Sequence, residues 1–378
     1  MISKTEKKRS VFIDLRYLKY LTNGFGQLSL FYISYFLQNP HKYVDLDITV
    51  LVPKEFVNKF GHHVKYIRLR KIYKILPFLL PTFDIAHSIS QQIKYAPISN
   101  KTFRIVTVHD LNFLYEKTPL KAKKRLRATQ SRIDLADLIT VISKFTQKEI
   151  ETHLDPKNTP IVLNYNGVLD ISQIPAEKPY FVNTDRKFFF TIGQILPKKN
   201  FHVLLDLMKL FPGYDLYICG DDTDKYAQEI QERINNEKPE NVFMTGVISF
   251  EDKIWMYRNC HAFFFPSKFE GFGIPVIEAM SFGKPVFSSR MTSLDEIGDK
   301  YAFFWDNFEP EYMKSIVDKN LSAFYENTEF IEEQKKYALS FSLEEHIERF
   351  FEIYRTVELK KKGSILATLK NYINLMKA

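Results

Sequence analysis

Short apolar segments alternate with longer amphipathic ones along the first half of the chain. Each short segment is rich in β-branched residues and ends in polar residues or glycine, which is typical of a strand. Segments 26–38 and 143–154 repeat their apolar residues with helical spacing, and Ser143 suits the N-cap of the second helix. This alternation predicts a parallel sheet that is buried on both faces. The expected strands are residues 10–15, 47–52, 84–89, 103–110, 138–143 and 160–168.

The same alternation begins again after residues 171–187, a segment with two prolines that we interpret as a linker. The expected strands of the second half are residues 188–193, 215–220, 242–246, 262–267 and 285–289, and its expected helices are 200–211, 225–236 and 250–260. The repeated pattern predicts an α/β protein of two doubly wound, Rossmann-like domains that face a cleft. In such sheets, ligands bind at the carboxyl ends of the strands.

We place the N-terminal Rossmann-like domain at residues 1–178 and the C-terminal domain at residues 179–345. C-terminal helices at 346–378 follow, and the stripe of apolar residues in 359–378 favours either a return to the N-terminal domain or contact with a membrane surface. Docking on the protein is the preferred interpretation.

Composition fits a folded protein with more than one core. The chain has 378 residues, of which 45% are hydrophobic and 26% are charged. No apolar stretch is long enough to span a bilayer, and no apolar signal region follows the charged N-terminus. The two cysteines, Cys219 and Cys260, form no CxxC pattern. We therefore expect a cytoplasmic protein, in contact with the inner face of the plasma membrane if its basic segments bind lipid.

Charge is distributed unevenly between the two halves. Residues 1–180 contain 28 Lys and Arg against 15 Asp and Glu, whereas residues 181–378 contain 25 against 30. A basic half favours an anionic partner such as lipid or an acidic glycan, and a solvated surface rich in lysine is the alternative. Segments 65–83, 117–132 and 359–378 combine basic and apolar residues and are candidates for an anionic membrane surface. No nucleic-acid-reading module is present, so we expect no nucleic acid partner.

The sequence FEGFGIPVIEAMSFGKPV (269–286) carries the most informative chemistry. Glu270 precedes a predicted helix that begins near Ile274, and Glu278 lies in its first turns. Glycines such as Gly273 allow the backbone to approach a ligand closely, and a helix N-terminus favours a phosphate. Carboxylates accept paired hydroxyl hydrogen bonds, as sugars require. The alternative is one glutamate that caps the helix and one that is exposed.

These residues resemble the Glu-x7-Glu signature of the retaining family-4 glycosyltransferases, which have the GT-B fold. Further segments occur in the order of that family, and the resemblance covers residues 11–356. The segments are FIDLR (12–16), NGFGQLSL (23–30), VTVHDLNFLYE (106–116), ADLITVISKFTQKEI (136–150), TIGQILPKKN (191–200) and VFMTGVISFED (242–252).

The resemblance implies roles for the strand–loop segment 191–200. A strand ends at Gly193, which would line the donor site. Lys198 and Lys199 follow before a predicted helix and would hold the donor diphosphate, and the alternative is that they are surface lysines on a loop. The family often has Arg directly after this glycine, where this chain has the neutral Gln194. Because the lysines would neutralise the diphosphate, we expect no metal and no other cofactor.

The same resemblance implies that domain 1–178 is the acceptor side and that domain 179–345 binds the nucleotide-sugar donor, and it supplies the remaining candidates. Glu278 would hold the ribose, Glu270 the donor sugar, and Ile274 and Gly273 the nucleotide. In the first domain, His109 would reach the donor sugar, although a histidine at a strand end is often structural. Gly24 and Gly26 would line the diphosphate, with a plain tight turn as the alternative. The candidate cleft residues are Asp110, Ser143, Gln194 and Val247.

The expected function is a retaining hexosyltransferase that uses a nucleotide diphosphate sugar. Its acceptor would be a hydroxyl of a glycan or lipid-linked glycan in surface polysaccharide or lipopolysaccharide synthesis. The PKKN variant at 197–200 resembles mannosyltransferases and favours mannose slightly over other hexoses. The alternatives are another GT-B enzyme, such as a nucleotide-sugar epimerase or a phosphorylase, and a non-catalytic nucleotide-sugar-binding scaffold subunit, which only Gln194 favours.

Overall fold

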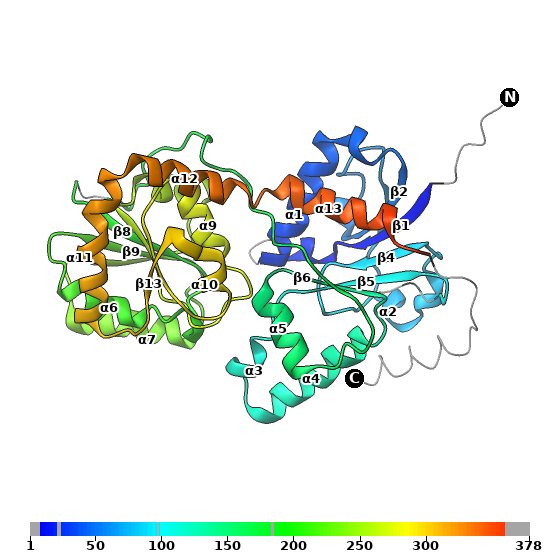
Figure 1. The fold of residues 1–378 in the computed structure, drawn as a ribbon, viewed down its shortest axis with the longest axis horizontal. Helices are drawn as coiled ribbons and strands as arrows, with labels where there is room; N and C mark the ends of the chain where they lie inside the picture. Colours follow the sequence, from blue (N-terminus) through cyan, green and yellow to red (C-terminus); the bar gives the residue numbers. More distant parts are fainter. Residues whose placement is uncertain (1–7, 21–23, 96, 98, 183–184, 360–378) are drawn as a thin grey trace. The chain divides into compact units, whose positions relative to one another are not determined.

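The computed structural model describes residues 8–20, 24–95, 97, 99–182 and 185–359 (Figure 1). The chain forms two compact units, unit 1 from residues 1–167 and 343–378, and unit 2 from residues 168–342. Unit 2 begins at Val168, and the segment that follows this residue packs on unit 2. There the Arg258 guanidinium donates to the Ser172 carbonyl at 3.1 Å. The tail 360–378, for which we expect docking or membrane contact, lies outside the described residues.

Unit 1 is built on a parallel sheet with the strand order β3-β2-β1-β4-β5-β6-β7. The strands are β1 (Arg9–Asp14), β2 (Leu46–Val52), β3 (Lys65–Arg68), β4 (Ile85–Ser88), β5 (Phe103–Val108), β6 (Leu138–Val141) and β7 (Ile161–Leu163). The α-helices are α1 (Gly24–Gln38), α2 (Ile72–Ile75), α3 (Phe113–Glu116), α4 (Pro119–Ile133), α5 (Lys144–His153) and α13 (Leu343–Thr356). Short 3-10 helices are η1 (Arg16–Lys19), η2 (Pro40–Tyr43), η3 (Lys54–Phe56) and η4 (Pro77–Leu79).

Successive side chains along the strands point to opposite faces of this sheet, and the two faces pack in different hydrophobic cores. Val11 and Ile13 of β1 pack with α1 and α13, whereas Phe12 faces the opposite side. Val106 and Val108 of β5 share that opposite side with the helices α3 to α5. Figure 1 shows α1 and α13 on one face and α3, α4 and α5 on the other. Both faces are covered, which explains why the strands read as nearly continuous apolar runs.

Unit 2 repeats this design with the parallel strand order β10-β9-β8-β11-β12-β13. The strands are β8 (Phe188–Ile192), β9 (Asp215–Cys219), β10 (Val242–Gly246), β11 (Ala262–Phe265), β12 (Val286–Ser289) and β13 (Ala302–Trp305). The α-helices are α6 (His202–Lys209), α7 (Lys225–Glu237), α8 (Phe250–Asn259), α9 (Ile274–Ser281), α10 (Ser293–Gly298), α11 (Pro310–Glu326) and α12 (Thr328–Leu339), and the 3-10 helices are η5 (Pro197–Lys199) and η6 (Asp299–Tyr301).

The prediction of two parallel-sheet α/β domains is confirmed. Each expected strand has a counterpart, but the expected strand 160–168 is a strand only over Ile161–Leu163, and the sequence interpretation missed β3 and β13. The β3 sequence KYIR is basic and only half-buried at its centre, because β3 is an edge strand. None of the helices within the described ranges is long and apolar enough to cross a bilayer.

The strand order reverses direction once in each sheet, between β1 and β4 in unit 1 and between β8 and β11 in unit 2. At such a switch point the loops after the two strands diverge and leave room for a ligand. A ligand site is therefore expected at the loops that follow the carboxyl ends of these strand pairs.

Candidate functional site

An ion pair joins the two loops at the switch point of unit 2. The Lys199 Nζ atom lies 2.5 Å from Glu270 Oε1, and the two side chains are 10% and 13% exposed. Lys199 belongs to η5 after β8, and Glu270 belongs to the loop after β11. The lysines lie on this 3-10 turn, before a helix as expected, although α6 begins at His202 and not at residue 200.

Several hydrogen bonds hold the Glu270 loop in place. The Ser267 hydroxyl lies 2.7 Å from Glu270 Oε1, and the Glu270 N–H donates to Thr292 Oγ1 at 3.1 Å. The Ser293 hydroxyl lies 3.0 Å from the Glu270 carbonyl oxygen. The Lys268 N–H donates to the Lys198 carbonyl at 2.7 Å, which ties this loop to η5. The carboxylate is thus fixed before any ligand arrives.

The charge balance keeps Glu270 ionised. Burial raises the pKa of its carboxyl, but the positive charges of Lys199 and Lys198 outweigh this effect and hold the pKa below its usual range. The Lys199 ammonium also lies 4.8 Å from the centre of the Phe265 ring. A buried, ionised carboxylate beside an ammonium can accept a hydroxyl hydrogen bond while the ammonium attracts a phosphate.

Two glycines make the close approach of these loops possible. Gly193 has a φ of 155°, and a Cβ atom there would lie 3.1 Å from Lys199 Cε. Gly273 has a φ of 112° and precedes α9, and a Cβ atom there would lie 2.7 Å from Leu294 Cδ2. The predicted start of α9 at Ile274 is confirmed, with Pro275 in its first turn.

Glu278 has a separate set of partners. It lies on α9 and is 9% exposed. Lys253 Nζ lies 2.7 Å from its Oε1, and the Tyr257 hydroxyl donates to its Oε2 at 2.9 Å. Both partners come from α8. Each carboxylate oxygen retains lone pairs for further hydrogen bonds, so a pair of ribose hydroxyls can still be accepted.

Gln194 and Val247 lie on neighbouring loops of the same edge. Gln194 is exposed and hydrogen-bonds Asp221, a carboxylate whose pKa is lowered mainly by hydrogen bonds from Thr223. Val247 follows β10 directly and is 69% exposed. The neutral Gln194 side chain thus contacts the loop after β9, and it presents no positive charge to a ligand.

In unit 1, His109 follows β5 and is buried as a neutral imidazole. Its Nε2 lies 2.8 Å from the Ile89 carbonyl oxygen. Since a carbonyl only accepts, Nε2 carries the proton and Nδ1 is left as an acceptor. Burial lowers the pKa of His109 to about 4, although the bond to Ile89 opposes this. The imidazole also meets the Phe25 ring edge-on at 4.6 Å between centroids.

Asp110 and Ser143 stabilise the loops beside His109. The Asp110 carboxylate accepts the Asn112 N–H at 3.0 Å. Ser143 caps α5 as predicted, because its hydroxyl oxygen accepts the Thr146 N–H at 3.1 Å. The Thr146 hydroxyl in turn donates to the His109 carbonyl at 2.9 Å, so the cap and the histidine are linked.

Gly24 and Gly26 lie in the first turn of α1, directly after residues that are not described. Gly24 is exposed and a Cβ atom there would meet no atom within 4 Å, whereas Gly26 is buried. Nothing in the contacts of Gly24 requires glycine structurally. Its role beside a diphosphate stays a prediction.

The sequence interpretation missed the residues that position the two glutamates. Lys253 and Tyr257 are four residues apart and therefore share one face of α8, which is a pattern that could have been read from EDKIWMYRNC (251–260). Ser267 lies three residues before Glu270 on the same loop. Thr292 comes from the loop after β12, and no local pattern connects it to Glu270.

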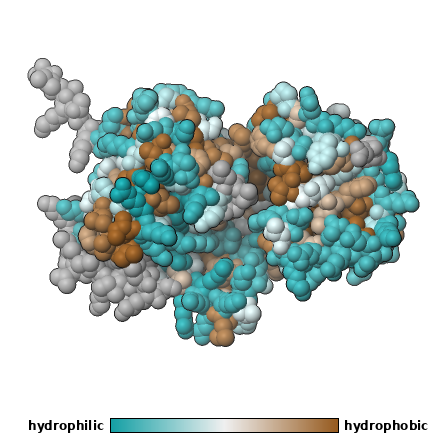
Figure 2. Space-filling model, turned by 180° about the vertical axis from the view of Figure 1, so that it is seen from behind, coloured by the Kyte–Doolittle hydropathy of each residue, from teal (hydrophilic) through white to brown (hydrophobic). Residues whose placement is uncertain are grey.

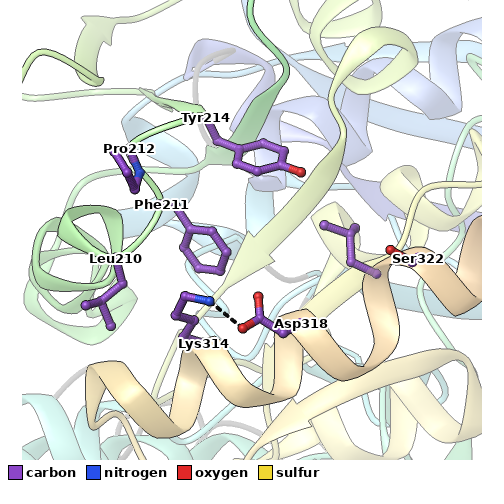
Figure 3. A pocket seen from close by; sticks show the side chains of 9 residues that line it. Leu210, Phe211, Pro212, Tyr214, Lys314, Asp318 and Ser322 are labelled. Carbon is purple, nitrogen blue, oxygen red and sulfur yellow. Dashed lines mark hydrogen bonds and ion pairs between the residues drawn. The ribbon is translucent and has the colours of Figure 1, made fainter.

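One pocket of about 310 Å³ opens at the amino ends of the unit 2 strands, beside the segment that precedes β9. Figure 3 shows Phe211, Tyr214 and Lys314 around it, with the ion pair between Lys314 and Asp318 at its rim. It lies away from the loops that carry the candidate residues and has no part in the site. Within the described ranges, no group of three His, Cys, Asp or Glu side chains could hold a metal ion.

Residues 173–338 match the family described as "Glycosyl transferases group 1". An uncharacterized glycosyltransferase of Methanocaldococcus jannaschii is 26% identical over 257 residues, which cover 64% of this chain and 69% of that protein. The serotype-specific mannosyltransferase WbdA of Escherichia coli is 26% identical over 71% of this chain and 35% of its own length.

The O-antigen chain mannosyltransferase B of Escherichia coli is 29% identical over 51% of this chain and 54% of its own length. The alignments thus span about a third to two thirds of these curated relatives. Among solved structures, the sucrose-phosphate synthase of Thermosynechococcus elongatus matches with a TM-score of 0.71 and 16% identity, over 92% of this chain and 98% of that one. The Anabaena protein HepE, solved with UDP and glucose, matches with a TM-score of 0.71 and 16% identity over 93% of this chain and 100% of that one.

Proposed function

We propose a function from the premise that this chain is a GT-B glycosyltransferase whose residues 173–338 belong to the glycosyl transferases group 1 family. The chain would transfer a hexose from a nucleotide diphosphate sugar to a hydroxyl group of a glycan or lipid-linked glycan. The configuration at the anomeric carbon would be retained. This transfer would contribute to the synthesis of a surface polysaccharide or lipopolysaccharide.

The observation that carries this proposal is the buried pair of Lys199 and Glu270 at the switch point of unit 2. A donor diphosphate needs a cation and the hydroxyls of a donor hexose need a hydrogen-bond acceptor, and this pair presents both, with the two atoms 2.5 Å apart. When the sugar bond breaks, negative charge develops on the diphosphate. Lys199, Lys198 and nearby backbone N–H groups would stabilise that charge without a metal ion.

Proton transfer in this proposal needs no protein base. The leaving phosphate oxygen would take the proton of the acceptor hydroxyl as that hydroxyl attacks on the same face of the sugar. Glu270 would hold the sugar hydroxyls in position. Because its carboxylate is already fixed by Ser267 and Lys199, the enzyme would spend little of the binding free energy on ordering it.

Glu278 would bind the ribose of the donor. Lys253 and Tyr257 hold its two oxygens in one orientation, so the remaining lone pairs point in fixed directions. His109, with its neutral ring and its free Nδ1, would accept a hydrogen bond from a sugar hydroxyl and would not add positive charge.

The favoured sugar is mannose. The support comes from the likeness to two curated mannosyltransferases, WbdA and mannosyltransferase B. The HepE structures with UDP and glucose show that the fold also accommodates a uridine nucleotide and glucose. A guanosine or uridine donor must therefore be distinguished by experiment.

Unit 1 would bind the acceptor and an anionic membrane surface. The segment around α2 and η4 exposes the apolar residues Ile75 (63%) and Phe78 (65%). Arg70, Lys71 and Lys74 flank them in the sequence, a combination that suits anionic lipid. Figure 2 shows hydrophobic patches that interrupt a largely hydrophilic surface on one face of the molecule. Helix α4 adds a row of exposed basic side chains.

The direct test is to incubate the protein with GDP-mannose, UDP-glucose, UDP-galactose and UDP-N-acetylglucosamine, with and without EDTA. We expect slow release of one nucleoside diphosphate, unchanged by EDTA and faster when a glycan acceptor is added. An α-configured product from an α-configured donor, measured by NMR, would establish retention. Release from none of the donors, together with no nucleotide binding, would refute the proposal.

A further inference from the structure

The pocket of about 310 Å³ in unit 2 lies between the segment that joins α6 to β9 and the central turns of helix α11 (Figure 3). It opens at the amino ends of the strands. Strands β8 and β9 have five residues each, so their length places the pocket about 16 Å from the carboxyl ends of these strands, where the loop with Lys199 begins. A molecule bound in this pocket therefore does not touch the Lys199–Glu270 pair.

Hydrogen bonds fix the wall that the α6–β9 segment contributes. The buried Asn241 side chain directs its Nδ2 group to the carbonyls of Phe211 and Tyr214, both at 3.1 Å. The Arg186 guanidinium donates to the carbonyl of Pro212 in the same segment. The wall is thus formed before a ligand arrives, which reduces the free energy that binding would spend on ordering it.

Hydroxyl groups are available on both sides of this pocket. The Tyr214 ring lies nearly parallel to the rings of Phe189 and His261, with centroid distances of 4.7 and 5.6 Å, so its hydroxyl has a fixed position. Across the pocket, α11 contributes Ser322. Among the described residues, neither the Tyr214 nor the Ser322 hydroxyl has a hydrogen-bond partner. Figure 3 shows the Phe211 and Tyr214 rings on one side and the α11 side chains on the other.

The two charges at the rim compensate each other. Lys314 pairs with Asp318 one turn further along α11, and the side chains are 35% and 51% exposed, so a ligand can reach them. The Lys314 ammonium also lies 5.0 Å from the centre of the Phe211 ring. The pair uses Oδ2 of Asp318, which leaves Oδ1 as an acceptor. An anion would be repelled by Asp318 and a cation by Lys314, so the rim favours an uncharged ligand.

The apolar and polar groups together match an uncharged sugar. The C–H face of a pyranose ring would pack against Phe211 and Leu321. Its hydroxyls would donate to Asp318 Oδ1 and bond with the Tyr214 and Ser322 hydroxyls. A purely apolar ligand would remove these polar groups from water without replacing their hydrogen bonds, which costs free energy. The volume of about 310 Å³ lies at the lower end of the range of about 300–1,000 Å³ for small-ligand pockets, so it suits a single sugar unit and not a nucleotide sugar.

We propose that this pocket is a second carbohydrate site, which binds one uncharged sugar unit apart from the site of transfer. The sugar would belong to the glycan that the enzyme extends, and this part of the inference rests on the proposed function. A glycan held here would remain attached to unit 2 after it leaves the transfer site. Its effective concentration for the next transfer would therefore increase.

The test is calorimetric titration of the full chain with GDP and UDP both present at saturating concentration, so that the donor site is filled. The probes are mannotetraose, maltotetraose, mannose, glucose and glucuronate. We expect a neutral tetrasaccharide to bind, and Tyr214→Phe and Asp318→Asn each to weaken it about fivefold or more, as the loss of one hydrogen bond predicts. Tighter binding of the tetrasaccharide than of its monosaccharide would support a glycan ligand, whereas equal affinities would overturn that assignment.

Matched controls separate this pocket from the general surface and from any other sugar site. Glu229→Gln removes a carboxylate from a similar pair with Lys225 on helix α7 of the same unit, and it should change the sugar affinity less than about twofold. Ser322→Trp fills the pocket from an exposed position of α11 and should abolish binding. Tyr214→Phe removes only a hydroxyl without a partner among the described residues, so its thermal melt should be unchanged and it retains a readout if another variant is poorly folded.

Four results would overturn the proposal: no binding of a neutral sugar, binding that the pocket variants leave unchanged, equal weakening by Glu229→Gln, or equally strong binding of glucuronate. Failure of the donor proposal is visible separately. If neither GDP nor UDP binds, the proposed function fails, and the dependence of sugar binding on Tyr214 and Asp318 can still be measured. If the nucleotides bind normally and the pocket variants change no sugar affinity, the present inference alone fails.

Discussion

The two units have the same sheet design but balance charge at their switch points in opposite ways. In unit 2, the Lys199 and Glu270 side chains cross from one loop to the other and neutralise each other. In unit 1, Arg16 and Asp14 pair within one segment at the end of β1, and the charges of Arg16 and Arg132 lower the pKa of Lys94. A site that is neutral before binding suits a ligand with both hydroxyls and phosphates. A site with surplus charge suits an anion.

The histidines sharpen this contrast. His87, His109 and His346 are buried in unit 1, and burial lowers their pKa values to about 3, about 4 and about 4. Their ring nitrogens bond Tyr354, Thr107, Ile89 and Tyr165. Unit 1 thus contains three neutral imidazoles in its interior, where unit 2 has His261 with a pKa of about 4 and His202, whose pKa burial also lowers.

The largest effect we expect is a selective loss of unit 1 in acid. A histidine with a folded pKa below its unfolded value stabilises the fold above pH 6.5, and this contribution is lost as the pH falls from 6.5 towards the folded pKa. At pH 5, each shift to about 4 corresponds to about 2 kcal/mol, so the three histidines of unit 1 outweigh His261.

The two tryptophans make this measurable. Trp255 and Trp305 both belong to unit 2, so their fluorescence reports on that unit alone. Circular dichroism reports on both units. We expect the dichroism signal to fall at a higher pH than the fluorescence changes. Simultaneous transitions, or an earlier change in fluorescence, would break the contrast between the units.

The next largest effect concerns the central ion pair. Lys199→Met leaves Glu270 as a buried carboxylate without its main partner, which should lower the free energy of unfolding of unit 2 by about 3–5 kcal/mol. Urea unfolding followed by tryptophan fluorescence measures this. The control is Lys225→Met, which removes a lysine that is 86% exposed from a surface pair and should cost less than about 1 kcal/mol. Similar losses in the two variants would show that the Lys199 pair is an ordinary surface contact.

A smaller effect is expected for the second carboxylate. Lys253→Met removes one of the two groups that orient Glu278 and leaves the Tyr257 hydroxyl in place. Nucleoside diphosphate affinity should fall about tenfold, or about 1.4 kcal/mol, while the folding stability changes little. Calorimetry and a thermal melt separate these outcomes. Unchanged affinity would remove Glu278 from the proposed nucleotide site.

The smallest effect tests the helix cap beside His109. Ser143→Ala removes the hydroxyl that caps α5 and should cost about 1–2 kcal/mol of stability, since Ser143 is fully buried. Asp224→Ala removes the N-cap of α7 from the more exposed surface of unit 2 and should cost less. Chemical unfolding of both variants measures the difference, and a larger loss for Asp224→Ala would contradict it.

The sequence predicted the elements that depend on local patterns. Buried parallel strands are apolar over their whole length, so strands such as β8 and β11 were readable from composition alone. Proline and glycine marked the start of α9. Edge strand β3 was missed because its side chains are half-exposed and charged, which breaks the apolar signal.

Contacts that join distant loops were beyond the reach of the sequence. Lys199 and Glu270 were both singled out, but as ligands of phosphate and of sugar, and nothing local showed that they pair with each other. Lys94 and Arg132 lie in different segments and only the fold brings them beside Arg16. Such arrangements depend on the strand order, which a pattern of hydrophobic residues does not specify.

The most direct test of the division of roles in unit 2 is calorimetric titration of Glu270→Gln and Glu278→Ala with the nucleoside diphosphate and with its sugar. We predict that Glu270→Gln binds the nucleoside diphosphate within about threefold of the unchanged protein while transfer falls by about a hundredfold or more. Glu278→Ala should weaken nucleotide binding by about tenfold or more. Equal loss of nucleotide affinity in the two variants would contradict the account.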